Sequence, residues 1–362
     1  MSPPSVCLVA GTLPDEPCGI GAYVDRLATS LSTLCPSVTV VTRASALIRA
    51  DRPYRVIQVD TSWRLADLPM LRGAVARVHA DVVHVQFPGI GYGRGLAATS
   101  LPMALRLRRR RPRLLFTIHE FLTFSPQWRL RVLAGMAFAD LVTAPDPDLA
   151  ADVGRRLGWV RVPVRYIPLG SNVGNVGEAA PAVVLHRTPD ELVVGFWGFF
   201  GPDKGLDDLV DAFVSVRRQR PARLVFVGAP GSESEHWATI QARIDKAGLR
   251  DDVLELGWVA QDQLAAVLHQ FDVCALPFTA GLTENRTSYA AAHAEGLYVV
   301  TTGSQPRYDA ERNTSFVRPR DVDALATEIL AAAERPQRPA SGAVSWDEIA
   351  ELHLQAYADA GA

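Results

Sequence analysis

ELVVGFWGFFGPDKG, residues 191–205, is the stretch that decides the fold of this chain. An apolar run, Leu192–Phe196, leads into a turn rich in glycine, and Lys204 stands directly before a helix that we expect to begin near Leu206. A helix N-terminus offers unpaired N–H groups and a partial positive charge, and glycines let a phosphate approach the backbone. The stretch therefore predicts a strand, a turn and a helix that bind a diphosphate at the start of a C-terminal domain.

The same alternation of strands and helices runs through the whole chain. Strands are predicted at 6–10, 38–41, 54–59, 81–86, 114–118, 141–143, 164–167, 192–196, 222–227, 253–256, 273–276 and 298–301. Helices are predicted at 22–34, 68–79, 97–110, 128–138, 206–217, 235–247, 261–269, 288–295, 322–335 and 345–358. This rhythm is typical of open, parallel sheets that are flanked by helices.

A passage rich in Pro, Gly and Ala, residues 167–189, divides the strands and helices into two groups. We therefore predict an α/β chain of two Rossmann-like domains, each with a doubly wound parallel sheet, that face each other across a cleft. The first domain spans residues 1–172 and the second 173–344, and a C-terminal helix at about 345–362 packs back on the first. Ligands of such sheets bind at the carboxyl ends of the strands.

Composition narrows the class of protein. The chain has 362 residues, of which 48% are hydrophobic and 21% charged, with a formal net charge of −2, which argues against a general nucleic-acid binder. Its four cysteines show no metal-ligand spacing, so we expect reduced thiols. We expect a cytoplasmic, soluble protein, because residues 5–11 resemble a strand more than a signal peptide and no apolar run is long enough to span a membrane.

One basic run stands out, Arg106–Arg113 at the end of a predicted helix. Two interpretations remain open for it. The arginines are a solvated helix terminus that complements the helix dipole, or they make peripheral contact with an anionic membrane surface, which would suit a lipid-linked acceptor.

Several motifs occupy the ends of the predicted strands. They are Gly19-Ile20-Gly21 before the first helix, His84-Val85-Gln86, Thr117-Ile118-His119-Glu120, Pro168–Asn172, Gly198–Gly205, Phe226–Gly228, Gly257-Trp258-Val259 and the loop and helix at 281–296. Together they resemble the motifs of retaining nucleotide-sugar glycosyltransferases of the GT-B fold, most closely glycosyltransferase family 4. The resemblance covers nearly the whole chain.

The resemblance implies a hexosyl-type enzyme that moves a sugar from a nucleoside diphosphate sugar to an acceptor hydroxyl, with retention of configuration and without a metal or cofactor. The implied donor-binding residues are Gly19, Gly21, Gly198, Lys204, Gly228, Trp258, Val259, Glu284, Arg286, Thr287 and Ser288. The implied acceptor-binding residues are His84, Gln86, His119 and Glu120. The implied catalytic residues are His119, Lys204 and Glu284.

The chain departs from the family pattern at two places. Many members carry an arginine where this chain has Phe199, so one of two diphosphate-binding cations is missing there. The family's pair of glutamates, eight positions apart, is reduced to Glu284, because alanines stand near the second position. Arg286 resembles the loop arginine of a subgroup, and we expect it to supply the missing cation.

The chemistry of transfer requires stabilisation of the negative charge that develops on the leaving diphosphate, which lysine, arginine and helix N-terminal amides can provide. Each assignment has a plainer alternative. In these alternatives, Lys204 is a solvated surface lysine, Thr287 or Ser288 only caps a helix, and His84 packs within the sheet. For the whole chain, the alternatives are a GT-B nucleotide-sugar epimerase and a catalytically silent nucleotide-sugar-binding protein.

Overall fold

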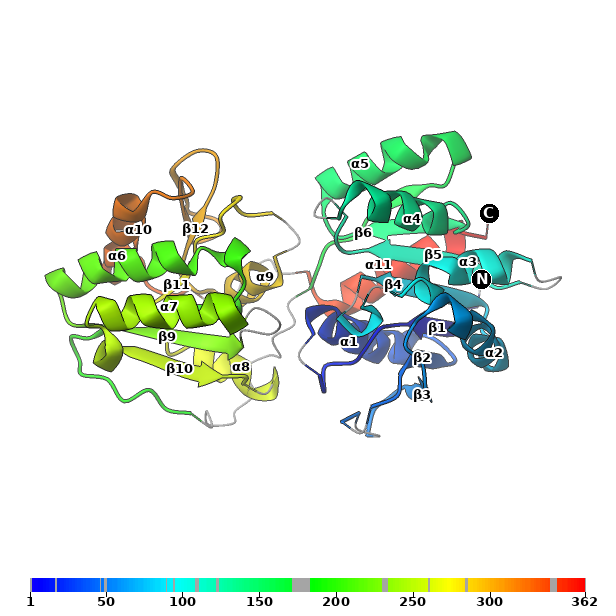
Figure 1. Ribbon diagram of the computed structural model, residues 1–362, viewed down its shortest axis with the longest axis horizontal. Coiled ribbons are helices and arrows are strands. Elements are labelled where there is room, and N and C mark those ends of the chain that lie inside the picture. The colour runs from blue at the N-terminus through cyan, green and yellow to red at the C-terminus, as the bar shows by residue number, and fades with distance from the viewer. Residues whose placement is uncertain are drawn as a thin grey trace. The chain divides into compact units, whose positions relative to one another are not determined.

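The computed structural model describes residues 2–361, apart from 17, 46, 49–50, 89, 94, 108–110, 122–123, 171–182, 230–233, 260, 284–285 and 339–343. The chain forms two compact units, each built on a seven-stranded sheet (Figure 1). Unit 1 comprises Met1–Gly170 and Val344–Ala362, and unit 2 comprises Ser171–Ala343. The prediction of two sheets in which parallel strands dominate and alternate with helices is confirmed.

The sheet of unit 1 is parallel throughout, with the strand order β3-β2-β1-β4-β5-β6-β7. Its strands are β1 (Val6–Val9), β2 (Val38–Arg43), β3 (Arg55–Val59), β4 (Val82–Phe87), β5 (Arg113–Ile118), β6 (Leu141–Ala144) and β7 (Val164–Tyr166). Its helices are α1 (Gly19–Leu34), α2 (Leu68–Val78), α3 (Ala97–Arg106), α4 (Pro126–Met136), α5 (Pro147–Leu157) and α11 (Trp346–Asp359). The order reverses direction between β1 and β4, which makes this pair the topological switch point of the sheet.

The C-terminal helix α11 completes the core of unit 1. Its side chains Ile349, Ala350 and Tyr357 are fully buried, in one cluster with Leu8 of β1 and Leu27 of α1. The helix begins with a capping box, in which Ser345 and Glu348 satisfy each other's backbone N–H groups. The last helix of the sequence is therefore a structural part of the first sheet's core.

The sheet of unit 2 has the order β10-β9-β8-β11-β12-β14-β13 and is parallel except for β13, which pairs antiparallel with β14. Its strands are β8 (Leu192–Phe199), β9 (Ala222–Ala229), β10 (Val253–Gly257), β11 (Val273–Leu276), β12 (Val299–Thr302), β13 (Arg307–Asp309) and β14 (Thr314–Val317). Its helices are α6 (Leu206–Gln219), α7 (Ser234–Lys246), α8 (Gln261–Leu268), α9 (Thr287–Ala294) and α10 (Val322–Leu330). Here the switch point lies between β8 and β11.

The core of unit 2 explains why residues 191–205 decide the fold. The side chains of Leu192, Val193, Val194 and Phe196 are almost wholly buried, so β8 is covered on both faces as a central parallel strand must be. A Cβ atom on Gly195 would lie 2.0 Å from the ring of Phe271, so glycine is required there by the packing of that ring. The strand is therefore both the first and a central strand of its sheet.

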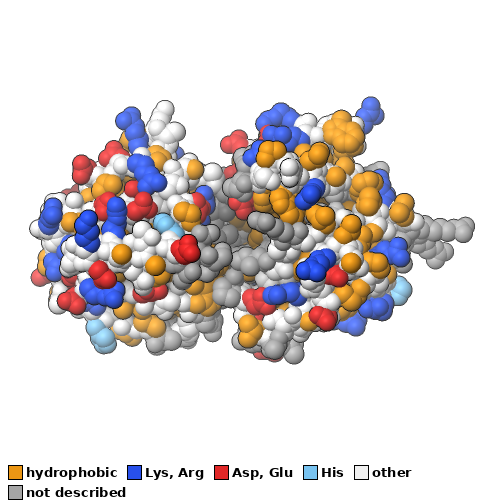
Figure 2. All heavy atoms as spheres, viewed as in Figure 1, with side chains coloured by type: hydrophobic (Ala, Val, Ile, Leu, Met, Phe, Trp, Pro, Cys, Tyr) orange, Lys and Arg blue, Asp and Glu red, His pale blue; other side chains and the backbone are white. Residues whose placement is uncertain are grey.

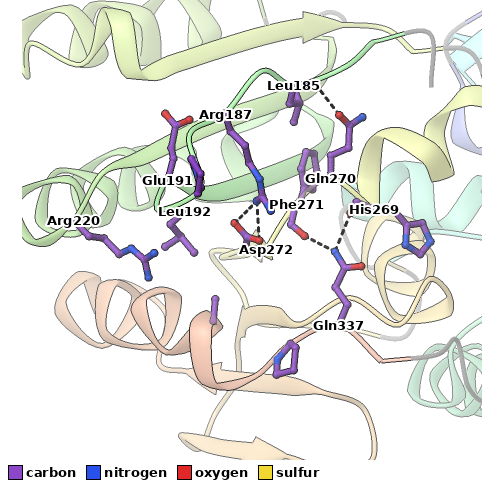
Figure 3. Close-up of a pocket in the computed structure, with 13 residues that line it drawn as sticks. Leu185, Arg187, Glu191, Leu192, Arg220, His269, Gln270, Phe271, Asp272 and Gln337 are labelled. Atoms are coloured by element: carbon purple, nitrogen blue, oxygen red, sulfur yellow. Dashed lines mark hydrogen bonds and ion pairs between the residues drawn. The ribbon is translucent and has the colours of Figure 1, made fainter. Parts of the chain in front are cut away.

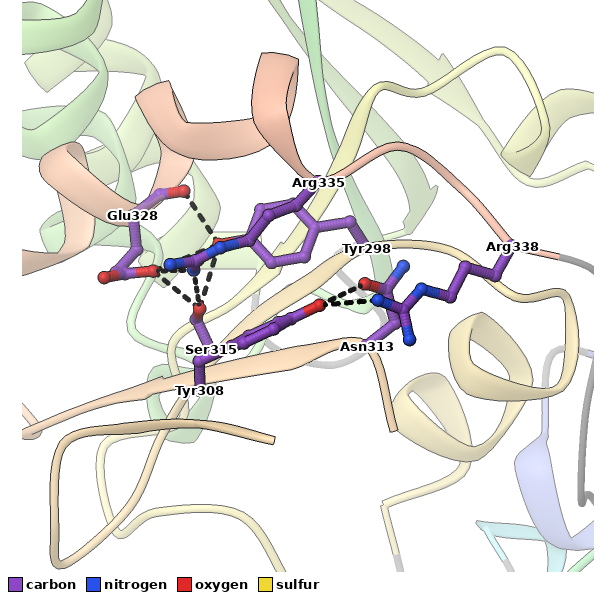
Figure 4. Close-up of polar contacts among 7 residues, drawn as sticks. All are labelled: Tyr298, Tyr308, Asn313, Ser315, Glu328, Arg335 and Arg338. Carbon is purple, nitrogen blue, oxygen red and sulfur yellow. Dashed lines mark hydrogen bonds and ion pairs between the residues drawn. The ribbon is translucent and has the colours of Figure 1, made fainter. Parts of the chain in front are cut away.

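Among the described residues, the structure contains one α-helix and two strands that we did not predict, namely α5, β13 and β14. The hairpin β13–β14 is held by Arg335, whose guanidinium lies 4.2 Å from the ring centre of Tyr308 and 5.6 Å from that of Tyr298 (Figure 4). The same guanidinium donates to Ser315 and pairs with Glu328 of α10. The hairpin thus depends on contacts from a distant segment, which its two short strands do not reveal.

The remaining expectations from composition concern cysteines, charge and membranes. All four cysteines are buried free thiols. On the face seen in Figure 2, positive and negative side chains are interspersed over unit 2, and Arg243 of α7 pairs with Asp211 of α6 at 3.2 Å. Among the described residues, no helix combines the length and the apolar character that crossing a bilayer requires.

Candidate functional site

The candidate site of unit 2 lies at the carboxyl ends of β8 and β11, the two strands of its switch point. The loop after β8 leads through a short 3-10 turn, η4 (Pro202–Lys204), into α6, and the loop after β11 leads into α9. In doubly wound sheets this is the place where loops separate and ligands bind. Lys204 and Arg286 therefore reach the same edge of the sheet from its two halves.

Glycines bring these loops into close contact. A Cβ atom on Gly205, which has a positive φ of 66°, would lie 2.0 Å from the carbonyl oxygen of Pro277. A Cβ atom on Gly228 would lie 1.9 Å from the carbonyl oxygen of Gly198. The first contact draws η4 against the end of β11, and the second keeps the ends of β8 and β9 level.

Lys204 and Arg286 meet at one carboxylate. Nζ of Lys204 donates to Oδ2 of Asp203 at 2.8 Å, and Nη1 of Arg286 donates to the same oxygen at 2.5 Å. The structure thus brings together the two cations that the sequence assigned to the diphosphate. Asp203 was not among the predicted site residues, because no motif distinguishes an acidic neighbour of a lysine from an ordinary surface residue.

Phe278, the second residue after β11, supports both cations. Its ring centre lies 4.6 Å from the guanidinium of Arg286 and 5.6 Å from Nζ of Lys204. The hydroxyl of Thr302 on β12 donates to the carbonyl oxygen of Phe278 at 2.5 Å and fixes this loop against the sheet. Phe278 is a further residue that sequence reasoning missed, since a buried aromatic after a strand resembles any other core residue.

Helix α9 begins beside the two cations. Its N-cap residue is Arg286, and the side chain of Arg286 makes no capping hydrogen bond. Because Thr287 and Ser288 lie inside the helix, the plainer interpretation of either one as the N-cap is wrong. Thr287 and Ser288 instead form the first turn, and Cβ of Ser288 lies 3.7 Å from the position of a Cβ on Gly198. The backbone amides and the hydroxyls at the start of α9 therefore lie beside Lys204 and Arg286, and all of these groups favour an anion.

The start of α6 differs from the one predicted from residues 191–205. Its first turn carries Asp207 and Asp208, and Arg320 pairs with them at 3.0 and 3.1 Å. These carboxylates already complement the positive end of the α6 dipole. Of the two helices that start at this edge, α9 is therefore the better anion site, and the contribution of the 191–205 stretch is Lys204.

Phe199, which stands where the family often has arginine, ends β8 and faces an aromatic partner. Its ring centre lies 5.8 Å from that of Trp258, with an angle of 30° between the planes. Trp258 follows β10 and has 49% of its surface exposed, while Val259 packs against the core. Only the small residues at the end of β9 separate the two strands, so the pair forms an aromatic contact at the carboxyl ends of β8 and β10.

In unit 1, Gly19 and Gly21 form the first turn of α1, directly after the loop that follows β1. A Cβ atom on Gly21 would lie 2.9 Å from the backbone of Leu13, so this glycine lets the loop pack on the helix. Tyr23, one turn further along, makes an edge-to-face contact with His119 at 4.7 Å between ring centres. The predicted glycine turn and the predicted histidine are thus neighbours.

His119 follows β5 and is bound to Gln86 of β4. Nε2 of His119 donates to Oε1 of Gln86 at 2.9 Å, and the amide nitrogen of Gln86 lies 3.0 Å from Nε2 of His84. His84 also contacts the hydroxyl of Thr117 at 2.6 Å and that of Tyr357 at 3.0 Å. A continuous polar chain therefore leads from the strand end at His119 into the core.

Burial governs the charge of these histidines. It lowers the pKa of His119 to about 3, and it lowers the pKa of His84 well below its usual value, with a further contribution from the neighbouring histidines. Both rings are therefore neutral at neutral pH. His119, which is 7% exposed, therefore supplies no positive charge at this strand end.

Two predicted acceptor contacts need correction. The side chains of His84 and Gln86 are completely buried, so neither presents a surface to an acceptor, and the alternative that His84 packs within the sheet is the one the structure supports. Their position gives them a different task, which is to hold His119. Glu120 is exposed, whereas Glu284 lies outside the described residues, as do residues 171 and 172 of the connector motif.

The basic run after α3 is partly paired. Arg106 and Arg111 both bind the carboxylate of Asp140, at 3.2 and 2.6 Å, while residues 108–110 lie outside the described part of the chain. Asp140 also accepts from the backbone N–H of Leu114. These two arginines thus help to fix the start of β5.

A cavity of about 650 Å³ in unit 2 lies at the amino ends of the strands, beside the starts of β8 and β11 (Figure 3). Its polar groups bind one another: Arg187 pairs with Asp272 at 2.7 Å, and Gln270 accepts from the backbone N–H of Leu185 at 2.7 Å. Gln337 donates to the carbonyl oxygens of His269 and Phe271. Because ligands of doubly wound sheets bind at the carboxyl ends of the strands, this cavity at their amino ends is the weaker candidate.

Comparison with known proteins supports the same division of the chain. Residues 17–174 match the family model described as Glycosyltransferase Family 4, and residues 191–335 match the one described as Glycosyl transferases group 1. No curated protein matches the chain in sequence.

Solved structures resemble the chain along almost its full length. Sucrose-phosphate synthase from Thermosynechococcus elongatus has a TM-score of 0.68 at 21% identity, over 98% of this chain and 96% of its own. HepE of Anabaena in complex with UDP-glucose has a TM-score of 0.65 at 18% identity, over 99% and 96%. A glycosyltransferase from Rickettsia africae has a TM-score of 0.65 at 13% identity, over 99% and 94%. At these identities the likeness establishes the fold, and with the two consecutive family matches it shows that the chain belongs to the GT-B glycosyltransferases, with a family 4 domain followed by a group 1 domain.

Proposed function

We propose that this glycosyltransferase moves a hexosyl group from a nucleoside diphosphate sugar to an acceptor hydroxyl, with retention of configuration and without a metal ion. The donor binds at the carboxyl ends of the strands of unit 2, and Lys204 and Arg286 hold its diphosphate. His119 of unit 1, in its neutral form, orients a sugar or acceptor hydroxyl by hydrogen bonding.

The observation that carries the proposal is the convergence of Lys204 and Arg286 on a single oxygen atom of Asp203, at the switch point of the sheet. Two cations that can bind one carboxylate oxygen can also bind one phosphate. The leaving diphosphate gains negative charge during transfer, and a lysine, an arginine and the start of α9 stabilise that charge without help from a metal. HepE, which has a similar fold, forms complexes with UDP and with UDP-glucose, which supports a donor of this class.

The first test is turnover of a panel of nucleoside diphosphate sugars in the presence of EDTA. We expect slow hydrolysis of one donor, seen as release of its nucleoside diphosphate, and with a suitable acceptor a product whose anomeric configuration by NMR equals that of the donor. Conversion of the donor into its epimer would favour a nucleotide-sugar epimerase. Binding without turnover of any donor would favour a catalytically silent protein, and inversion would exclude retention.

The second test uses the two lysines of the chain, Lys204 and Lys246. Lys246 lies in the last turn of α7 and is exposed, so it is a matched control. The nucleoside diphosphate should protect Lys204, but not Lys246, from an amine-reactive label that is read by mass spectrometry. Lys204→Ala should weaken nucleoside diphosphate binding roughly 10- to 100-fold, the effect of one charge-assisted hydrogen bond, and Lys246→Ala should leave it unchanged. Equal labelling and equal affinity would remove Lys204 from the site.

A further inference from the structure

Asp203 stands at the centre of the proposed diphosphate site although its charge has the wrong sign for binding an anion. Its Oδ2 accepts from both Lys204 and Arg286, and its Oδ1 lies 2.9 Å from the position of a Cβ on Gly201, so the lack of a side chain at Gly201 leaves room for the carboxylate. Its backbone oxygen accepts from the N–H of Thr279 at 3.0 Å, which anchors the residue to the loop after β11. The carboxylate thus lies at the point that a phosphate would have to reach.

The two cations have support that does not depend on Asp203. Both lie against the ring of Phe278, which is completely buried, and their side chains are only 18% and 21% exposed. The side chain of Asp203 is 46% exposed. Because the anion is the more exposed partner, the carboxylate can turn toward solvent while Lys204 and Arg286 keep their positions.

Arg286 has a further donor that points to an additional anion. Its Nε atom is buried and, among the described residues, has no hydrogen-bond partner. A buried N–H without a partner costs free energy, which an oxygen acceptor placed there would recover. Asp203 binds Nη1 of the guanidinium, so it satisfies this arginine only in part.

We infer that Asp203 is an internal competitor for the diphosphate, which pairs with Lys204 and Arg286 until phosphate oxygens replace it and which returns as the nucleoside diphosphate product leaves. The inference rests on the proposed function, since it concerns the same site. It gives Asp203 a definite effect on turnover, because a carboxylate that takes back both cations weakens product binding and speeds product release.

Ionisation of Asp203 fits this exchange. Burial disfavours the charged carboxyl, but the charges of Lys204 and Arg286 and their hydrogen bonds outweigh burial and hold the pKa of Asp203 below its usual range. The carboxylate is therefore charged at neutral pH and competes at full strength. A diphosphate carries more negative charge than one carboxylate and offers more acceptor oxygens, so it can win the exchange.

The test is Asp203→Asn, which keeps the shape and removes the charge. The matched control is Asp207→Asn, which removes a charge four residues away that pairs with Arg320 and not with the two cations. Inorganic pyrophosphate and a panel of nucleoside diphosphates are titrated calorimetrically into the wild type and both variants.

We expect Asp203→Asn to bind pyrophosphate and the preferred nucleoside diphosphate roughly two- to tenfold more tightly, because the partly exposed ion pairs that the ligand must replace are lost. Asp207→Asn should change the affinity by less than about twofold. In turnover, Asp203→Asn should show a lower KM and stronger inhibition by the nucleoside diphosphate product.

Equal or weaker binding by Asp203→Asn would overturn the inference and make Asp203 an organiser of the cations instead. The absence of pyrophosphate binding by all three proteins would overturn it as well. Tighter pyrophosphate binding by Asp203→Asn, without turnover of any nucleotide sugar, would uphold the competitor and reject the proposed function, so the two failures can be told apart.

Discussion

At the scale of single residues, Phe278 shows how a core side chain can serve a polar site. Its ring supports Arg286 and Lys204, and it is buried in the cluster that contains β8 and β11. The attraction between a cation and an aromatic face contributes roughly 0.5 to 2 kcal/mol, and the contribution is larger where water is excluded. The same ring therefore contributes both to the stability of unit 2 and to the placement of two charges.

These two contributions can be separated with Phe278→Leu. The substitution should lower the free energy of unfolding by about 1 kcal/mol, and it should weaken nucleoside diphosphate binding roughly two- to tenfold, because the aliphatic side chain no longer attracts the cations. Phe213→Leu on α6 makes the same change in a fully buried ring of the same core. It should lower the free energy of unfolding, measured in urea, by a similar amount and leave nucleoside diphosphate binding unchanged. Similar binding losses in both variants would mean that only core packing matters.

The sequence was informative about residues whose position follows from a motif and uninformative about their partners. Lys204 and Arg286 were selected, and the structure brings them together. Asp203 and Phe278 were not, since a carboxylate beside a lysine and an aromatic after a strand have many ordinary explanations. Gln86 and His84 were selected for the wrong reason, because a strand pattern alone does not tell which polar side chain is completely covered.

At the scale of elements, the alternating apolar runs predicted the central strands well because those strands are buried on both faces. The hairpin β13–β14 was missed because its strands have three and four residues and depend on Arg335 from far along the chain. Helix α5 could have been found. Asp146 caps its start by accepting from the N–H of Leu149 at 2.8 Å, and Pro147 follows, which is a recognisable helix start.

The C-terminal helix α11 offers a prediction at this scale. Tyr357 lies on α11 and its hydroxyl is 3.0 Å from Nδ1 of His84, so Tyr357→Phe would leave a buried histidine nitrogen without its partner. We expect unit 1 to lose about 1 to 3 kcal/mol of stability, seen as an earlier unfolding transition in urea. Tyr166→Phe on β7, where the side chain is exposed, is the control and should change stability by less than about 0.5 kcal/mol. An equal effect of the two substitutions would show that the tyrosine hydroxyl does not support the histidine network.

At the scale of the whole molecule, the two units should respond in opposite ways to mild acid. In unit 1, burial lowers the pKa of His119 and of His353 to about 3 and lowers that of His84 well below its usual value. In unit 2, the hydrogen bond to Glu295 raises the pKa of His269 in spite of partial burial. Ordinary carboxyl groups titrate at about pH 4, so histidines dominate the range just below neutrality.

The sign of each effect follows from proton binding. An unfolded histidine takes up a proton below a pH of about 6.5, whereas the buried rings of His119 and His353 stay neutral until about pH 3, so unit 1 loses stability as the pH falls through this window. At pH 5.5 the loss approaches about 1.4 kcal/mol for each histidine. His269 binds its proton more tightly in the folded chain than in the unfolded one, because its pKa is raised on folding. Its contribution to stability is therefore present below pH 6.5 and is lost as the pH rises through the raised pKa.

Hydrogen exchange at pH 7.5 and 5.5, corrected for the intrinsic exchange rates, measures both units in the same sample. We expect peptides of β1, β4 and α11 to lose protection at pH 5.5 while those of β8 and β11 keep theirs. In His353→Gln, an amide replaces the ring nitrogen that binds Tyr23 at 2.7 Å and cannot titrate, so the acid loss of unit 1 should shrink by about 1.4 kcal/mol. Equal loss in both units, or an unchanged acid response in His353→Gln, would show that the histidines do not set the response. Since His119 belongs to the same buried network, a unit 1 that opens in mild acid would also lose the geometry that holds His119 on Gln86, which ties the pH range of the enzyme to the packing of its first core.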